Sequence, residues 1–283
     1  MPRVLNFRFD TLGVPFMPFL DLDPDFKPYY EIHDATDPWT RPQTVLFVHG
    51  FTESTQAFRA WVPYLSRKYR VVTYDLRGFG RTAPVDSEFR FTTDLYVDDM
   101  VRVIGRLAGE PVHVVGFKSG CISTLRLAAT RPDLVRSITL ACPPMVAPGG
   151  ADWQPFMEEH GMRAWARKTM PARLGKDAPP SAIDWWTDLM GATSITTARA
   201  YLRWVGTTRA GDDMPAVACP ALVIMTKLSA QTNAAAGQVP PEVVQQGMPH
   251  AEILLLDLDC YHPAASHPDI CAPATLAFLQ KLA

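Results

Sequence analysis

The sequence of 283 residues lacks any apolar run long enough to span a membrane, since the longest runs, at residues 45–48 and 253–256, have the length of strands. It also lacks blocks of like charge, and its formal net charge is only −2. Such a balance gives no sign of nucleic acid or of an anionic membrane surface as a partner. We therefore expect a small-molecule substrate, with neither nucleic acid nor membrane as a partner.

Paired cysteines are missing as well. The five cysteines occur singly, without a CxxC pair, so neither a zinc site nor any other metal site is expected. The first residues lack a long apolar stretch followed by a small-residue cleavage site, which argues against a signal peptide. An odd number of unpaired cysteines without such a signal favours a reducing compartment, so we expect a cytoplasmic protein.

What the sequence does contain is an alternation of strand-like and helix-like segments. Short β-branched and apolar runs at 44–48, 69–74, 111–115, 137–141, 221–225 and 251–256 predict strands, and residues 29–33 predict an edge strand. The run at 44–48 is apolar throughout, as is typical of a strand buried on both faces of a parallel sheet. Strands alternating with helices predict an α/β fold with helices on both faces of a mostly parallel sheet.

The alternation stops between residues 143 and 218. Helical periodicity is present at 153–170, 181–190 and 196–205, and no convincing strand pattern separates these pieces. We therefore predict one α/β core, formed by residues 1–142 and 219–283, with a helical lid inserted at 143–218.

Four segments carry a more specific signal: residues 49–51, 75–82 and 116–120, each after a predicted strand, and His262 after the last one. Their order and strand context resemble the α/β-hydrolase fold family from about residue 29 onward. The resemblance implies an eight-stranded, mostly parallel sheet and the class label hydrolase. Residues 161–166 also resemble the start of the lid in relatives of 3-oxoadipate enol-lactonase.

The segment 116–120 resembles the nucleophile elbow of this family, a sharp strand-to-helix turn that lifts one side chain above the sheet. Gly116 and Gly120 supply the small flanking residues, and the lifted residue is Lys118 where the family normally has serine. Ser119 is one place too late to be the nucleophile, so we expect its side chain to point away from the site. The resemblance implies that the backbone N–H groups of Ser119 and Phe51 form the oxyanion hole.

The acid of the usual triad is also missing. No Asp or Glu occurs between Asp213 and Glu242, and Ser229 stands where the family places the acid. The stretch 142–146, the other place that the family uses, has no carboxylate either. Asp257 and Asp259 are weak candidates for orienting His262, the one remaining triad member. A Ser-His-Asp mechanism therefore cannot operate here.

A lysine at this position should be partly neutral. Burial under a lid and the positive end of the following helix both disfavour its charged form, and a neutral amine can attack carbonyl groups. The leading hypothesis is a cofactor-independent enzyme acting on a small carbonyl- or ester-type substrate through Lys118, with His262 moving protons. Carbon–carbon cleavage or another lyase-like step would suit these residues. The predicted substrate pocket is lined by Thr52, Ser229, Trp153 and Trp186.

Two alternatives stay open on the sequence alone. Lys118 could remain charged and pair with a ligand carboxylate, which would make the protein a non-catalytic small-molecule binder. The chain could also be a pseudoenzyme that keeps the hydrolase fold without the chemistry, although a buried lysine without a purpose is costly. The oligomeric state stays open on the sequence alone, and a homodimer is one of the alternatives.

Overall fold

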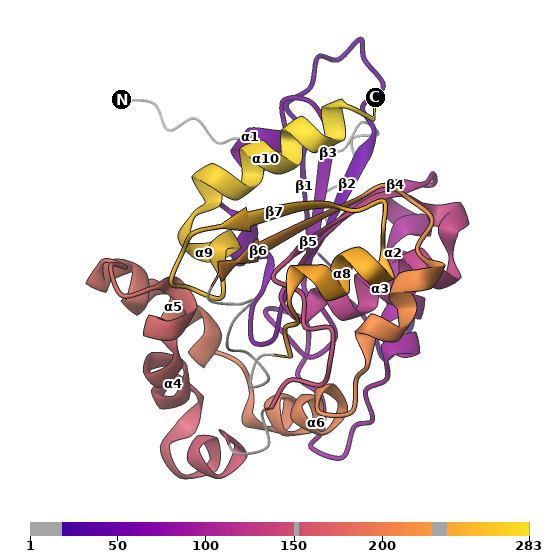
Figure 1. The fold of residues 1–283 in the computed structure, drawn as a ribbon. Helices are drawn as coiled ribbons and strands as arrows, with labels where there is room; N and C mark the ends of the chain where they lie inside the picture. The colour runs from indigo at the N-terminus through magenta and orange to yellow at the C-terminus, as the bar shows by residue number, and fades with distance from the viewer. Residues whose placement is uncertain (1–18, 150–152, 228–236, 283) are drawn as a thin grey trace, which may run out of the picture.

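The computed structural model describes residues 19–149, 153–227 and 237–282, which form a sheet with helices on both faces (Figure 1). The sheet has seven strands in the order β1-β3-β2-β4-β5-β6-β7, with only β1 antiparallel to its neighbour. The strands are β1 (Tyr30–His33), β2 (Thr44–Val48), β3 (Arg70–Tyr74), β4 (Val112–Phe117), β5 (Val135–Ala141), β6 (Ala221–Thr226) and β7 (Glu252–Leu256). The predicted α/β architecture, a mostly parallel sheet with helices on both faces, is confirmed.

The prediction of eight strands is wrong for the described part of the chain. Residues 19–29 precede β1 and form only two isolated bridges, Phe19 with Tyr29 and Asp23 with Phe26. Pro24 and Pro28 lie in this stretch and cannot donate a backbone N–H to a strand ladder. The segment therefore does not extend the sheet.

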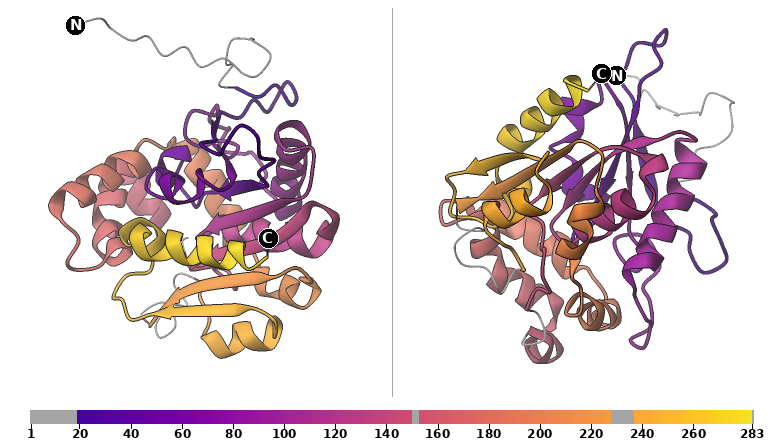
Figure 2. Two further views of the ribbon diagram at one scale, coloured as in Figure 1. Left: turned by 90° about the horizontal axis from the view of Figure 1, so that it is seen from above. Right: turned by 45° about the vertical axis from the view of Figure 1, so that its right-hand side comes forward.

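Two apolar layers hold the helices against the sheet. Val45 and Phe47 of β2 pack with the face that carries α1 (Val62–Leu65) and α10 (Pro268–Gln280). Leu46 and Val48 point to the opposite face, which carries α2 (Thr93–Leu107), α3 (Gly120–Thr130) and α8 (Pro241–Gly247). Alternate residues of one strand thus enter two different cores, which explains why this strand is apolar throughout. Figure 2 shows the helical layers on both sides.

Between β5 and β6 the chain forms α4 (Trp153–Leu174), α5 (Pro180–Gly191), α6 (Ile195–Val205) and the short 3-10 helix η3 (Ala210–Ala216). Helix α4 is interrupted at Gly161, whose φ of 84° is not helical. Residues of α4, α5 and α6 share a separate apolar cluster that includes Trp165, Met170 and Met190, whereas Ala210 and Met214 of η3 pack into the core of the face that carries α3. Helices α4, α5 and α6 lie below the sheet in the view of Figure 1. None of the helices described is long and apolar enough to cross a membrane.

Candidate active site

The turn between β4 and α3 places Lys118 in a strained backbone conformation with a φ of 50°. A Cβ atom at Gly120 would lie 2.5 Å from the carbonyl oxygens of Val48 and His49. At Gly116 it would lie 2.8 Å from a side-chain oxygen of α3. The two glycines are therefore required for the close approach of this turn to β2 and α3, as predicted from their spacing.

The amine of Lys118 is buried, and the side chain is only 8% exposed. Its Nζ donates a hydrogen bond of 2.9 Å to the carbonyl oxygen of Tyr261 and lies 4.6 Å from the centre of that ring. Among the described residues no carboxylate forms an ion pair with it. Burial lowers the pKa of Lys118 to about 8, while nearby Cys142 raises it and Arg173 lowers it to a smaller extent. About a tenth of the amine is then neutral at pH 7.

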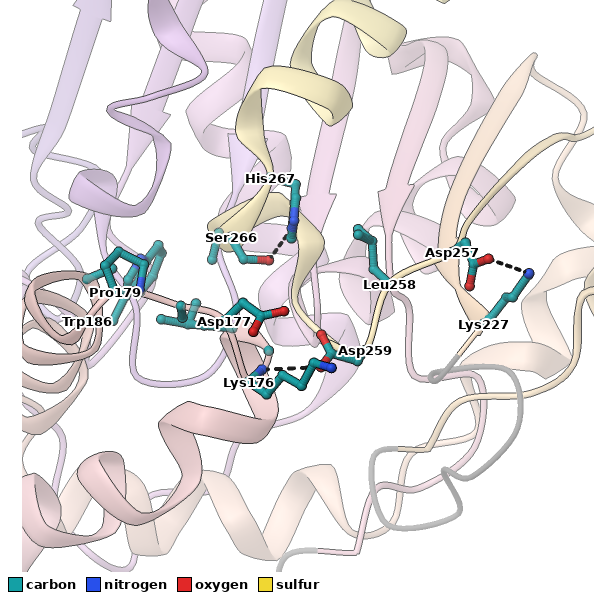
Figure 3. A pocket seen from close by; sticks show the side chains of 15 residues that line it. Lys176, Asp177, Pro179, Trp186, Lys227, Asp257, Leu258, Asp259, Ser266 and His267 are labelled. Atoms are coloured by element: carbon teal, nitrogen blue, oxygen red, sulfur yellow. Dashed lines mark hydrogen bonds and ion pairs between the residues drawn. The ribbon is translucent and has the colours of Figure 1, made fainter.

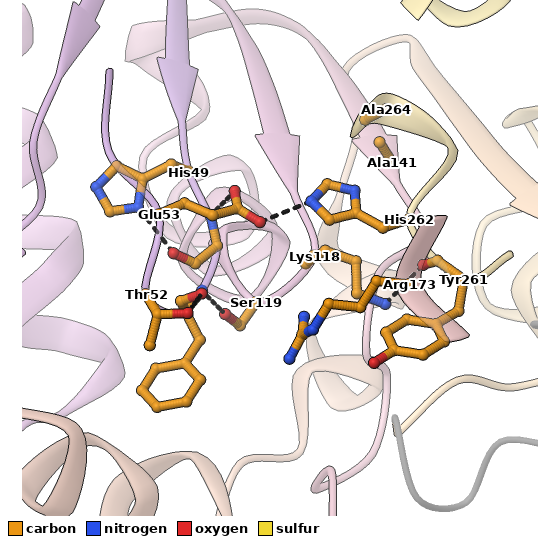
Figure 4. A network of polar contacts seen from close by, with 12 residues as sticks. His49, Thr52, Glu53, Lys118, Ser119, Ala141, Arg173, Tyr261, His262 and Ala264 are labelled. Carbon is orange, nitrogen blue, oxygen red and sulfur yellow. Dashed lines mark hydrogen bonds and ion pairs between the residues drawn. The ribbon is translucent and has the colours of Figure 1, made fainter. Parts of the chain in front are cut away.

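The side chain of Ser119 is placed differently from the prediction. Its Oγ accepts a hydrogen bond of 2.9 Å from the backbone N–H of Phe51 (Figure 4). Its hydroxyl also interacts with the hydroxyl of Tyr201. The expectation that this side chain points away from the site is therefore wrong. The physical reason is that the hydroxyl satisfies a backbone donor which would otherwise be unpaired. The N–H of Phe51, predicted to bind an oxyanion, is thus occupied by Ser119.

His262 has an acidic partner that the sequence analysis missed. Its Nε2 lies 2.6 Å from Oε1 of Glu53, and both side chains are only 1% exposed. The other carboxylate oxygen of Glu53 accepts a hydrogen bond of 3.0 Å from the N–H of Gly50. Nδ1 of His262 is buried and has no partner among the described residues.

The charge states of this pair follow from its surroundings. Burial lowers the pKa of His262, so its ring is neutral and its Nε2–H donates to Glu53. Burial raises the pKa of Glu53, but the His262 ring and the Gly50 N–H lower it by more, so the carboxylate is ionised. The pair therefore carries one buried negative charge near the Lys118 amine.

One signal in the sequence could have revealed Glu53. The family pattern places the acid after β5 or β6, whereas Glu53 follows β2. Strands β2 and β4 are parallel neighbours, with Val48 paired to Gly116, so their carboxyl ends meet at one edge of the sheet. A carboxylate a few residues after β2 therefore lies beside the elbow after β4.

A cavity of about 340 Å³ opens between the elbow and the helices α4 and α6. Lys118, Ser119 and Glu53 line its base. Its walls include Phe51, Trp153, Met157, Trp165, Tyr201 and Tyr261, and its basic side chains besides Lys118 are Lys168 and Arg173. His262 does not line it, so Glu53 is the member of the buried pair that reaches the cavity.

The predicted pocket residues are only partly brought together. Trp153 lines the cavity, whereas Thr52 is 1% exposed and does not. Trp186 packs against the ring of His262, with the ring centres 5.6 Å apart, and lines a different cavity. Ser229 lies outside the described residues.

That second cavity is larger, about 720 Å³, and its lining includes Trp186, Asp257 and Asp259 (Figure 3). Lys118 and Glu53 are not among its lining residues. Asp257 forms an ion pair of 2.7 Å with Lys227, and Asp259 accepts a hydrogen bond from the N–H of Lys176. Neither aspartate orients His262, so the smaller cavity is the candidate active site. The described residues contain no cluster of His, Cys, Asp or Glu that could hold a metal ion.

Comparison with known proteins agrees with the fold. A family model described as the alpha/beta hydrolase fold matches residues 43–220, so the chain belongs to this family. A solved structure, the enol-lactonase from Burkholderia xenovorans, superposes with a TM-score of 0.80 over 93% of this chain and 100% of that chain. Its identity is 19%, so this likeness shows the fold alone.

Curated relatives match over shorter stretches. The probable oxidoreductase EphD of Mycobacterium tuberculosis is 40% identical over 80 residues, which are 28% of this chain and 14% of that protein. A strigolactone esterase of pea, Pisum sativum, is 28% identical over 149 residues, or 48% of this chain and 56% of that one. The chain thus spans about half or less of these relatives.

Proposed function

We propose that this chain is a cofactor-independent enzyme in which the amine of Lys118 replaces the usual serine hydroxyl as nucleophile toward a small carbonyl compound. The observation that carries the proposal is the position of the Lys118 amine. It lines the cavity at the elbow, its pKa is lowered to about 8 by burial, and no carboxylate of the described residues neutralises it. A relative named as an esterase supports a carbonyl-type substrate.

The chemistry begins with attack of the neutral amine on the carbonyl carbon. A nitrogen–carbon bond forms while the carbonyl π bond breaks, and the oxygen takes up a proton to give a carbinolamine. Loss of the hydroxyl and the remaining amine proton as water gives an imine, which can withdraw electrons from an adjacent carbon–carbon bond. Attack on an ester would instead leave a stable amide on the lysine, so a ketone or aldehyde suits this site better.

Proton transfer is assigned to the buried pair. Glu53 lines the cavity and can take a proton from the attacking nitrogen, while His262 holds the other side of the carboxylate. His262 thus acts through Glu53 and not by direct contact with the substrate. An oxyanion would bind the N–H of Phe51 by displacing the Ser119 hydroxyl, with the N–H of Ser119 as second donor. Helices α4, α5 and α6 would serve as the lid.

Reductive trapping tests this proposal. The protein is incubated with small ketones, aldehydes and keto acids in the presence of borohydride, followed by intact-mass measurement and peptide mapping. We expect an adduct on Lys118 that is absent from Lys118→Met. Lys168→Met is the matched control, because it removes another lysine of the same cavity and should leave the adduct in place. Failure to trap any carbonyl compound, or trapping on other lysines only, would contradict the proposal.

A second candidate function is non-catalytic binding of a small molecule. It is favoured by one observation, the occupation of the Phe51 N–H by the hydroxyl of Ser119. A binder would retain its ligand unchanged, whereas the proposed enzyme would convert it. Mass analysis of the ligand recovered after incubation distinguishes the two.

A further inference from the structure

The candidate active site has an excess of positive charge. Lys118, Lys168 and Arg173 line the cavity, and Glu53 is the one acidic residue among the described residues that line it. The carboxylate of Glu53 is already engaged by His262 and by the N–H of Gly50. None of the three basic side chains forms an ion pair with a described carboxylate. An anionic group on the ligand would therefore offset charges that the protein leaves uncompensated.

Arg173 is the best placed of the three. Its guanidinium carbon lies 5.2 Å from the centre of the Trp165 ring and 5.5 Å from that of Tyr261, and its Nε donates a hydrogen bond of 3.3 Å to Thr169. These contacts fix the guanidinium while its two terminal nitrogens make no hydrogen bond to the described residues. Figure 4 shows the Arg173 side chain beside those of Lys118 and Tyr261. The group is thus held in position with free donors.

The two lysines of the cavity fit roles other than binding the anionic group. Lys168 is exposed and lies 4.9 Å from the centre of the Phe156 ring, which places it at the rim. Lys118 is needed in its neutral form for the proposed chemistry. The walls between these groups are largely aromatic and aliphatic, with Trp153, Met157 and Trp165 among them. A ligand that fills the cavity should therefore combine one anionic group with an apolar body.

We infer that the cavity selects small molecules with a carboxylate on an aromatic or aliphatic body, and that Arg173 is the residue that binds the carboxylate. A planar guanidinium offers two parallel N–H donors that match the two oxygens of a carboxylate. A single such fork suits a monoanion, whereas a phosphate dianion would call for more donors than Arg173 supplies. With the proposed function, on which this further step rests, the substrate is a keto acid whose carbonyl reaches Lys118 while its carboxylate sits on Arg173.

Binding is tested first without any reaction, by calorimetric titration of phenylacetate and of phenylacetamide, which differ in the charge of one group. We expect phenylacetate to bind more tightly, and Arg173→Gln to weaken its binding by about 10- to 100-fold while leaving the amide unaffected. The matched control is Arg163→Gln, since Arg163 lies on the same helix, is 69% exposed and pairs with Asp188 outside the cavity. Equal affinity for acid and amide, tighter binding of benzylphosphonate, or no effect of Arg173→Gln would overturn the inference.

Trapping then separates this inference from the proposed function. Phenylpyruvate and phenylacetone present the same ring and ketone, and only the first carries a carboxylate. Faster trapping of phenylpyruvate on Lys118, with the advantage lost in Arg173→Gln, supports both proposals. Equal trapping of the two compounds overturns carboxylate selection and leaves the lysine nucleophile standing. Arg173-dependent binding of phenylacetate without any adduct overturns the lysine nucleophile and leaves the carboxylate site standing.

Discussion

Nε2 of His262 and Oε1 of Glu53 lie 2.6 Å apart although 209 positions separate the two residues in the sequence. The contact joins the turn after β2 to the loop after β7, and both side chains are almost fully buried. The histidine of the hydrolase pattern is thus held by an acid from a different strand than the one where the acid was expected.

The first prediction concerns this buried pair. Glu53→Ala should lower the free energy of unfolding by about 1–3 kcal/mol, because it leaves the buried N–H groups of the neutral His262 ring and of Gly50 without their acceptor. Glu53→Gln keeps the shape and an acceptor oxygen and should cost less. Denaturant unfolding of the three proteins at pH 7 measures the difference. Equal stability of Glu53→Ala and the parent would show that the contact does not contribute.

The second prediction concerns the stability cost of Lys118. Its pKa falls from 10.5 to about 8 on folding, so the folded state binds fewer protons than the unfolded state between these values. The free energy of unfolding should therefore rise with pH in this window, by about 3 kcal/mol in total. Lys118→Met should be the more stable protein at pH 7, and its advantage should shrink from pH 8 to pH 10.5. An advantage that is constant with pH would contradict this.

The third prediction is the pH dependence of trapping. The neutral amine reacts, so the initial rate of adduct formation on Lys118 should rise with pH and level off above about 8. Rates are measured by mass spectrometry at a fixed concentration of carbonyl compound. Lys168→Met should show the same midpoint. A midpoint near the ordinary lysine value of 10.5 would mean that the amine is not perturbed as described.

The fourth prediction tests the packing of the elbow. Gly120→Ala should destabilise the protein by several kcal/mol, on the order of 3 or more, since the new Cβ would lie 2.5 Å from two carbonyl oxygens. Gly105→Ala is the control, because a Cβ there meets nothing within 4 Å and the residue lies inside helix α2. It should stabilise by about 0.5–1 kcal/mol. Thermal unfolding of both variants provides the comparison.

Much of the fold could be predicted because its signals are local. A strand such as β2 is apolar throughout since both of its faces are buried, and the spacing of Gly116 and Gly120 marks the elbow. The eighth strand was inferred from the family and not from a pattern in residues 19–29. Pro24 and Pro28 are the local signal against a strand in this stretch.

The site was harder to predict because its contacts join distant segments. Glu53 reaches His262 only through the order of the strands, and Arg173 reaches the cavity only through the packing of α4. The direction of the Ser119 side chain depends on a hydrogen bond to Phe51, 68 positions away. The sequence pattern identifies Lys118 as the residue at the elbow, whereas tertiary packing determines which side chains surround it.

The glycines that flank Lys118 have a consequence for how such proteins diversify. Since Gly116 and Gly120 hold the turn through backbone packing, the turn itself does not depend on the side chain between them, which adds a hydrogen bond to the Tyr261 carbonyl. Under the proposed function, the reactive group at this point is exchangeable, and a hydroxyl, thiol, carboxyl or amine can be installed by one codon change without rebuilding the turn. The same property makes this chain a starting point for designed amine catalysts.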